Sequence, residues 1–460
     1  MSTKPNIIFI IADDHRASSI GAYGCDEVKT PNLDRLADRG TTFTNAHCQG
    51  GFNPAVCVPS RASFLSGRSV FDLSDPAERD VNDFSAGARI PDTMPTVPDR
   101  LRAAGYHTHA VGKWHNDKAS FARGFVSADK ILFDGMCEHE DMHLQDHDAS
   151  GDYHDERACH VPGFSTDIFK EAAVRFLAQA TQEQPFFLYL AFTAPHDPRT
   201  PPEAYKVDPD TVRLPNAYAP AHPFDNGEMI IRDELLNAFP RTPDDVRQHV
   251  ADYYGMINHL DDAIGQILAK CTERGFLDNT VVVYTADHGL GLGNHGLMGK
   301  QNLYEHSLGI PLVFAGPAVP IQKLDALVWH ADTHATLLCM AGETPDPSCA
   351  GVNLIPLMTR DESESPRDYF GAAYRSSQRM IRDQRYKLIR YYRDEQADED
   401  RISPTPGVQL EQMFDLESDP DELINLIFVP EYRSTRERLR AALDQWQLQE
   451  RDQLYTPQSL

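Results

Sequence analysis

Short apolar runs alternate along the chain with stretches in which apolar residues recur every three or four positions. Most of the runs are nearly continuous in apolar character, which is typical of strands buried on both faces of a parallel sheet. They lie at residues 6–12, 106–111, 185–192, 280–286 and 310–315. This alternation predicts an α/β fold in which helices sandwich a large, mostly parallel sheet.

The helical patterns cover residues 31–39, 96–104, 166–180 and 244–274. The longest of them ends just before Gly275, and glycine commonly terminates a helix. Two long stretches, 135–163 and 195–243, follow neither period and are rich in Asp, His, Gly or Pro. We expect both to be long loops, a kind of segment that often carries binding surfaces.

The pattern changes after about residue 360. Short alternating segments at 369–374, 378–381 and 386–392 predict a small antiparallel sheet, and residues 430–449 have a helical pattern. We therefore expect a large α/β domain of residues 1–360. A smaller C-terminal α+β subdomain of residues 361–460, with a terminal helix, would follow it.

Polar side chains follow four of the predicted strands at the point where each strand ends. Asp13-Asp14 follow the first, Lys113 and His115 the second, His196 the third and Asp287-His288 the fourth. Ligands of open α/β sheets bind at the carboxyl ends of the strands, so we expect these side chains to meet at one rim. Lys300 lies in a glycine-rich loop, where backbone can approach a ligand closely.

Asp13, Asp14 and Asp287 together offer an oxygen-rich site that suits Ca²⁺ or Mg²⁺. Two adjacent aspartates after a strand are more often a turn or a helix cap, and this alternative stays open for the pair alone. His288 is the less certain ligand, because imidazole is a poor partner for Ca²⁺.

The segment Cys57-Val58-Pro59-Ser60-Arg61 combines a thiol with a Pro-Ser-Arg sequence typical of a helix start. The exposed backbone N–H groups and the dipole of a helix N-terminus favour an anion there, and Arg61 lies one turn further on. An ordinary buried thiol is the plainer alternative, which the flanking prolines Pro54 and Pro59 make less attractive.

These motifs together resemble the type I sulfatases of the alkaline-phosphatase-like superfamily over nearly the whole chain. The matching pieces are Asp13-Asp14, Cys57-x-Pro59-Ser60-Arg61, Ser66-Gly67-Arg68, Gly112-Lys113-Trp114-His115, Ala194-Pro195-His196, Asp287-His288-Gly289 and Gly299-Lys300. The resemblance implies that Cys57 is oxidised by a formylglycine-generating enzyme to formylglycine, whose hydrate is the nucleophile.

The resemblance also implies a role for each side chain at the rim. Asp13, Asp14, Asp287, His288 and the residue derived from Cys57 would hold a divalent cation, calcium before magnesium. Lys113 and Lys300, with the metal, would neutralise charge on the sulfate oxygens, and Arg61, with the cation, would favour ionisation of one hydroxyl of the hydrate. His196, with or without Lys300, would protonate the leaving oxygen, and His115 would accept a proton from the nucleophile.

The composition limits the kinds of molecule that the protein is expected to bind. The chain has 69 acidic and 43 basic residues, a formal net charge of −26, which argues against a nucleic acid. An anionic substrate would need locally focused cations. No apolar stretch is long enough to span a membrane. The first residues read as a strand, and the eight cysteines lack C-x-x-C spacing, so we expect reduced thiols and a cytoplasmic location.

Two other functions stay open: a phosphomonoester or phosphonate monoester hydrolase of the same superfamily, and a non-catalytic binder of sulfated glycans. The polar loops around the predicted rim suit a sulfated sugar better than a simple aryl or alkyl sulfate. Their candidate substrate-binding residues are Arg16, Asn116, Asp197, Arg199 and Arg375.

Overall fold

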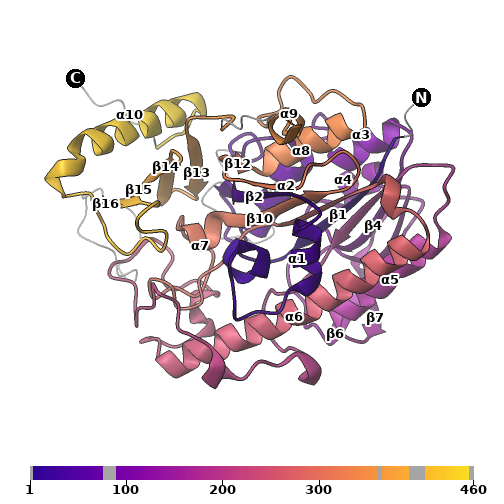
Figure 1. Ribbon diagram of the computed structural model, residues 1–460, viewed down its shortest axis with the longest axis horizontal. Coiled ribbons are helices and arrows are strands. Elements are labelled where there is room, and N and C mark those ends of the chain that lie inside the picture. The colour runs from indigo at the N-terminus through magenta and orange to yellow at the C-terminus, as the bar shows by residue number, and fades with distance from the viewer. Residues whose placement is uncertain (1–3, 76–89, 360–364, 393–409, 455–460) are drawn as a thin grey trace.

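The computed structural model describes residues 4–75, 90–359, 365–392 and 410–454. A nine-stranded sheet in the order β11-β2-β10-β9-β1-β8-β4-β5, with β12 beside β2, forms its centre (Figure 1). The strands from β9 to β5 in that order run parallel, and β10 is antiparallel to both of its neighbours. The strands are β1 (Asn6–Ala12), β2 (Gly40–His47), β4 (His107–Lys113), β5 (Ser127–Leu132), β8 (Phe186–Ala191), β9 (Thr280–Ala286), β10 (Gly309–Ala315), β11 (Gln322–Leu324) and β12 (Val328–Trp329). This confirms the predicted fold class.

Helices cover both faces of this sheet because its strands are apolar on both sides. Alternate residues of β1 enter two different cores: Ile7 and Phe9 pack in one, Ile8 and Ile10 in the other. The first core is completed by α2 (Cys57–Ser66), α3 (Val97–Ala103), α4 (Lys118–Gly124) and α8 (His330–Met340). The second is completed by α1 (Pro31–Ala37), α5 (Ser165–Gln179) and α6 (Pro243–Glu273), which lie together in Figure 1.

A second sheet of five strands, with the terminal helix packed against it, confirms the predicted small antiparallel sheet and terminal helix. Its order is β16-β15-β14-β13-β3. Its elements are β3 (Gly50–Gly51), β13 (Phe370–Tyr374), β14 (Gln378–Arg382), β15 (Tyr386–Tyr391), β16 (Leu410–Asp415) and α10 (Arg433–Gln449). Strand β3 belongs to the predicted large domain and pairs with β13, so the two units share this sheet. The division at residue 360 stays a prediction.

One predicted loop is partly wrong. Residues 135–163 contain a hairpin of β6 (Asp141–Leu144) and β7 (Cys159–Pro162). Each strand has only four residues, too few for a clear alternation, although Met142 and Leu144 are buried on one face of β6. Residues 195–243 form the expected loop, with 3-10 turns at η5 (Glu203–Tyr205), η6 (Pro209–Thr211) and η7 (Glu234–Leu236). Two further short α-helices are α7 (Glu305–Leu308) and α9 (Ile355–Thr359).

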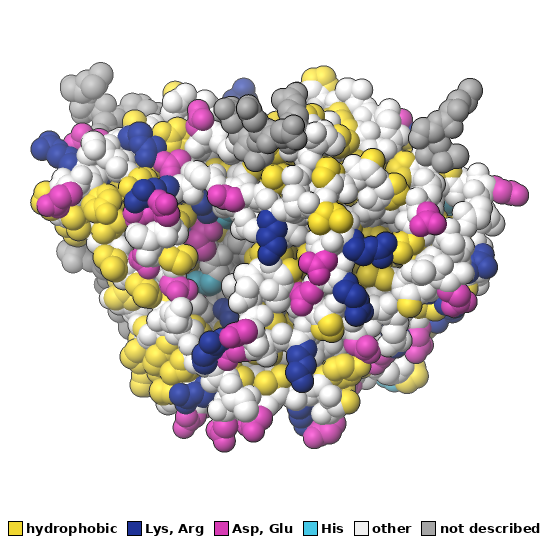
Figure 2. Space-filling model, in the orientation of Figure 1, with side chains coloured by type: hydrophobic (Ala, Val, Ile, Leu, Met, Phe, Trp, Pro, Cys, Tyr) yellow, Lys and Arg dark blue, Asp and Glu magenta, His cyan; other side chains and the backbone are white. Residues whose placement is uncertain are grey.

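On the viewed face the surface charge is of mixed sign, and the cysteines are unpaired. On the face in Figure 2, basic side chains are scattered among acidic ones and form no continuous basic stripe. All eight cysteines are free thiols. Within the described residues, no helix combines the length and the apolar character that crossing a membrane requires.

A buried ion-pair network joins the two units. Lys387 of β15 has no exposed side-chain surface, and its Nζ lies 3.0 Å from Glu305 Oε1 and 2.8 Å from Glu422 Oε1. Arg382 adds a second cation to Glu305, with 2.8 Å between NH1 and Oε2. Since Glu305 begins α7, shortly after the loop that carries Lys300, the network anchors the C-terminal sheet close to the rim.

We expect Lys387→Met to destabilise the fold strongly, because it leaves the buried Glu422 carboxylate without its cation and removes one cation from the half-buried Glu305. Breaking a buried pair in this way costs about 3–5 kcal/mol of unfolding free energy. Equilibrium urea unfolding measures the loss. The exposed Lys323, whose Nζ donates to the Ala22 carbonyl, provides the matched control Lys323→Met. Equal unfolding midpoints for the two variants would contradict a stabilising role of the network.

Candidate active site

The side chains predicted to meet at one rim do lie together. Asp13 and Asp14 follow β1, Asp287 follows β9, and the two strands are neighbours in parallel register. The Asp14 amide donates to Asp287 Oδ1 at 3.1 Å, which links the two strand ends directly. Lys113 ends β4, and its Nζ contacts Asp13 Oδ2 at 2.5 Å.

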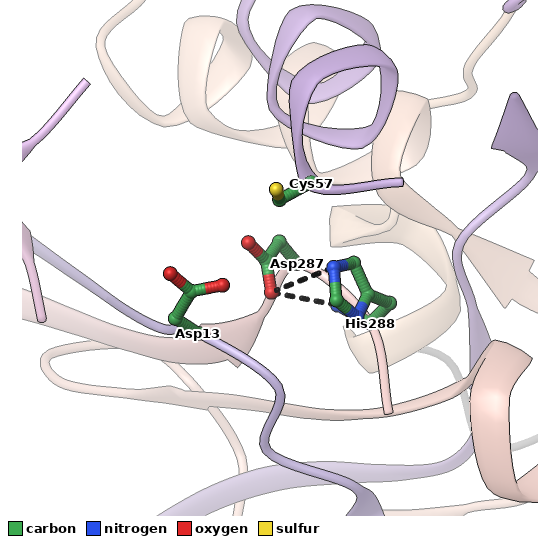
Figure 3. Close-up of side chains that lie close together, drawn as sticks. All are labelled: Asp13, Cys57, Asp287 and His288. Atoms are coloured by element: carbon green, nitrogen blue, oxygen red, sulfur yellow. Dashed lines mark hydrogen bonds and ion pairs between the residues drawn. The ribbon is translucent and has the colours of Figure 1, made fainter. Parts of the chain in front are cut away.

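Cys57 faces this group from the first residue of α2 (Figure 3). It is buried, with 1% of its surface exposed. Its Sγ lies 3.1 Å from His115 Nδ1 and 3.9 Å from Lys113 Nζ. Burial raises the pKa of the thiol, but His115, Lys113 and Lys300 outweigh it and hold that pKa well below its ordinary value. The site therefore stabilises negative charge at position 57.

Each carboxylate of the site has a buried cation beside it. Besides Lys113 on Asp13, Lys300 Nζ lies 2.9 Å from Asp14 Oδ1. Arg61, one turn into α2, donates from Nε to Asp287 Oδ2 at 2.9 Å and from NH1 to the Lys113 carbonyl at 3.1 Å. A buried charge without such a partner would cost several kcal/mol, so these pairs are what allow the site to form.

The pKa values around Asp287 reflect burial together with the close packing of charged groups. Burial raises the pKa of Asp13, yet Lys113, His196 and Arg61 bring it well below its usual range. At Asp287 burial and the nearby Asp13 carboxylate prevail, and its pKa is raised. Burial lowers the pKa of His288, but Asp287 raises it to about 9. A further positive charge between these groups would relieve the repulsion.

The donor set fits a divalent cation. Asp13, Cys57, Asp287 and His288 each offer one ligand atom, and these atoms lie within 4.8 Å of one another. Asp13 Oδ1 and His288 Nε2 are buried and have no hydrogen-bond partner among the described residues. Buried polar atoms normally have a partner, so two such atoms aimed at one place indicate a ligand between them. Asp14 forms a second, overlapping group with Asp13 and His196.

Two of the site residues hold their side chains with an unusual backbone. Asp14 has φ of 66° and His115 has φ of 54°, both in the left-handed region that non-glycine residues seldom adopt. Such conformations cluster at functional sites, where the surrounding structure holds them in place.

A pocket of about 730 Å³ opens over Cys57. Its lining includes five predicted residues: Cys57, His115, Asn116, His196 and Lys300. It also includes residues that the sequence analysis missed, among them Phe133, Met136, Arg232, Asp233 and Gln301. Gln301 adjoins Lys300 and could have been suspected for that reason, whereas Arg232 lies in a long loop whose sequence has no periodic pattern.

The predicted substrate-binding residues divide into two groups. Asn116 lines the pocket, and Asp197 adjoins it through an ion pair with Arg232. The other three residues are not among the described residues that line the pocket. Arg16 donates to Ser19 and Asn294, Arg199 lies over the Tyr253 ring, and Arg375 pairs with Glu228. A substrate contact by any of the five stays a prediction.

Comparison with known proteins identifies the family. The profile of the family described as sulfatase matches residues 5–343. The chain belongs to the sulfatase family. A second profile, N-sulphoglucosamine sulphohydrolase C-terminal, matches residues 293–449 of this sulfatase. These matches, and the sulfatase relative in the following paragraph, show that the protein is a sulfuric ester hydrolase. The family also implies a metal and a formylglycine.

Individual relatives cover almost all of the sulfatase. An N-acetylglucosamine-6-O-sulfatase of Bacteroides thetaiotaomicron is 27% identical, over 98% of this chain and 87% of its own. A solved structure of a protein with its substrate D-glucosamine-2-N,6-O-disulfate has a TM-score of 0.74 at 24% identity. The match covers 99% of this chain and 100% of that one. The phosphonate monoester hydrolase of Agrobacterium radiobacter has a TM-score of 0.74 at 22% identity. This match covers 97% of this chain and 96% of that one. At such identities the solved structures establish the fold alone.

Gly135 provides a test of the position of His115 in this sulfatase. A Cβ at residue 135 would lie 2.3 Å from His115 Nε2, so Gly135→Ala must displace the imidazole. We expect sulfate ester hydrolysis to fall about tenfold or more, since a small misplacement of a reacting group is that costly. Gly124→Ala, whose added Cβ meets the Pro98 ring instead, is the control. Steady-state kinetics of the two folded variants measures the effect. Equal activities of the two variants would contradict the placement of His115.

Proposed function

We propose that this sulfatase removes sulfate from a carbohydrate, after Cys57 has been converted to formylglycine by a formylglycine-generating enzyme. The observation that carries the proposal is the position of Cys57. It begins α2, next to His115, and faces two carboxylates and an imidazole that suit a metal. No other thiol among the described residues belongs to such a group.

We infer that Asp13, Asp14, Asp287 and His288 hold the metal, and that it is Ca²⁺. Three carboxylates supply the hard oxygen ligands that Ca²⁺ and Mg²⁺ prefer, and Ca²⁺ accepts the looser geometry of such a mixed set. When bound, the cation and the formylglycine hydrate supply an activated oxygen nucleophile and offset charge on the sulfate ester.

The remaining roles fall to the chain's own side chains. Arg61 holds Asp287 through its Nε, and Lys113 and Lys300 place positive charge where the anionic group of the substrate would lie. His115 Nδ1 lies within reach of position 57 and can accept a proton there. His196 Nδ1 donates to the Asp197 carbonyl at 2.6 Å, so Nε2 faces the site, and the doubly protonated ring can give its Nε2 proton to the leaving oxygen.

A carbohydrate is supported by the relatives and by the pocket. The named relative is an N-acetylglucosamine-6-O-sulfatase, and a protein of the same fold was solved with a glucosamine disulfate. The pocket of about 730 Å³ is within the range of small-molecule sites and combines apolar side chains with several charged ones. Such a lining suits a sugar, which has both apolar faces and hydroxyl groups.

A phosphorus monoester is the second candidate, because the fold is shared with a phosphonate monoester hydrolase. The same cations and nucleophile would serve a phosphoryl group. A non-catalytic glycan binder is a third possibility, which loss of sulfate release would favour.

We expect the peptide of residues 40–61, obtained with trypsin after co-expression with a formylglycine-generating enzyme, to carry an aldehyde or its hydrate at residue 57. Tandem mass spectrometry is needed because Cys48 is in the same peptide. The matured protein should release sulfate from sulfated monosaccharides faster than phosphate from the matching phosphates. Cys57→Ser should abolish multiple turnover, because one serine hydroxyl leaves no second oxygen on that carbon.

Three results would contradict the proposal. An unmodified thiol at residue 57, with a known sulfatase matured in the same cells, would exclude formylglycine. Faster phosphate release would favour the phosphorus ester. Binding of sulfated sugars without release of sulfate would favour the glycan binder.

Metal binding has a readout apart from activity. We expect Ca²⁺ to raise the melting temperature of chelator-treated protein, and Mg²⁺ to raise it less. A ligand at a hundred times its dissociation constant stabilises by about 2.7 kcal/mol. Asp13→Asn should lose most of the shift, whereas the exposed Asp155→Asn should keep it. A shift retained in Asp13→Asn would place the ion elsewhere.

A further inference from the structure

Arg232 lines the same pocket as Cys57 and lies in the long loop between β8 and α6. Its side chain is 36% exposed and contacts two carboxylates at once. One end of the guanidinium, NH2, pairs with Asp197 Oδ2, and the other, NH1, lies 3.0 Å from Asp233 Oδ1. Both carboxylates are largely buried, with 6% and 12% of their side chains exposed.

The first carboxylate leads to His196. Asp197 is the next residue in the chain, and its carbonyl accepts the His196 Nδ1–H at 2.6 Å. A carbonyl oxygen only accepts, so this bond fixes which ring nitrogen points away from Asp197. The other nitrogen, Nε2, lies 3.9 Å from Asp14 Oδ2, inside the site. The position of Asp197 therefore sets the orientation of the His196 ring.

The second carboxylate leads to Lys300. Asp233 Oδ2 accepts from Gln301 Nε2 at 2.7 Å, and Gln301 Oε1 accepts from the Lys300 amide at 3.0 Å. Gln301 Nε2 also donates to the Pro54 carbonyl at 3.1 Å, just before the helix that carries Cys57. Through Gln301, the position of Asp233 thus influences the backbone position of Lys300 and that of the segment just before Cys57.

We propose that Arg232 is a positioning residue that fixes His196, the proposed proton donor to the leaving group, and Lys300 beside it, by joining Asp197 and Asp233. This inference rests on the proposed function. It assigns Arg232 to the step in which the bond to the sugar oxygen breaks, because both chains of contacts end on groups placed for that step.

The chemistry of the guanidinium suits this role. A planar fork with donors on two sides can hold two carboxylates in a fixed relation, whereas a lysine is a single flexible point charge. His196 and Lys300 come from loops about a hundred residues apart in the chain. Without the fork, two buried carboxylates would also repel each other at the pocket edge.

The test compares two sulfate esters that differ in their need for a proton. A nitrophenolate leaves readily without protonation, and a sugar alkoxide does not. With Arg232→Met we expect kcat/KM for a sulfated sugar to fall by roughly a hundredfold, the lower end of what acid catalysis contributes, because Arg232 acts only through other residues. For nitrophenyl sulfate the change should stay within about threefold, and KM should change little for either ester.

Further variants separate positioning from a general loss of structure. Arg232→Lys should recover part of the lost activity on the sugar sulfate. Asp233→Asn should show the same selective loss, and the double variant should lose less than the sum of the two, since the residues act as one unit. Arg213→Met, an exposed arginine paired with Asp26 and Glu27, should leave both esters unaffected.

Equal losses on both esters would overturn the proposal, and so would a rise in KM alone, which would make Arg232 a contact for the sugar. These results require an active wild-type protein. A wild-type protein that releases sulfate from neither ester would instead contradict the proposed function itself.

Discussion

The pairing of buried carboxylates with buried cations at the ends of β1 and β9 is the interaction on which the rest of the site depends. Asp13 and Asp287 lie out of contact with water, and each is held by a cation that comes from another element. Arg61 reaches Asp287 from α2, and Lys113 reaches Asp13 from β4. Removing any one of these partners leaves a charge in a medium that solvates it poorly. The sheet order, the start of α2 and the chemistry of the rim are therefore fixed together.

The C-terminal sheet supports the same site from outside. Strand β3 pairs with β13 a few residues before Cys57, so it fixes the approach to the nucleophile. Gln378 of β14 donates from Nε2 to the Gln301 carbonyl at 3.2 Å and to the Asn226 carbonyl at 3.0 Å. The sheet thus holds the loop that carries Lys300 and the loop that carries Arg232. The smaller unit is part of the pocket's scaffold, although most of the reacting groups come from the larger one.

Much of this arrangement could be predicted from the sequence, because strands buried on both faces have a strong apolar signal. The predicted bounds of β1 and β9 are the observed ones, and the rule that ligands bind at strand ends brought Asp13, Asp287 and Lys113 to one place. Strand β2 was missed because four of its eight residues are threonine or asparagine, so the segment has neither a continuous apolar run nor a clear alternation. Arg232 and Asp233 were missed because their position depends on tertiary contacts across a long loop, which leave no local pattern.

The charge of the whole protein and the charge of the site point in opposite directions, and the difference explains how an acidic protein can bind an anion. The chain carries a formal net charge of −26, which repels a sulfate ester at long range. At the rim, three carboxylates are matched by Arg61, Lys113 and Lys300, so the buried groups alone are close to neutral. Salt screens the distant surface charges within about 10 Å, whereas charges inside the pocket act at short range in a low dielectric. A divalent cation held there would make the local charge positive and would draw an anionic substrate into the pocket.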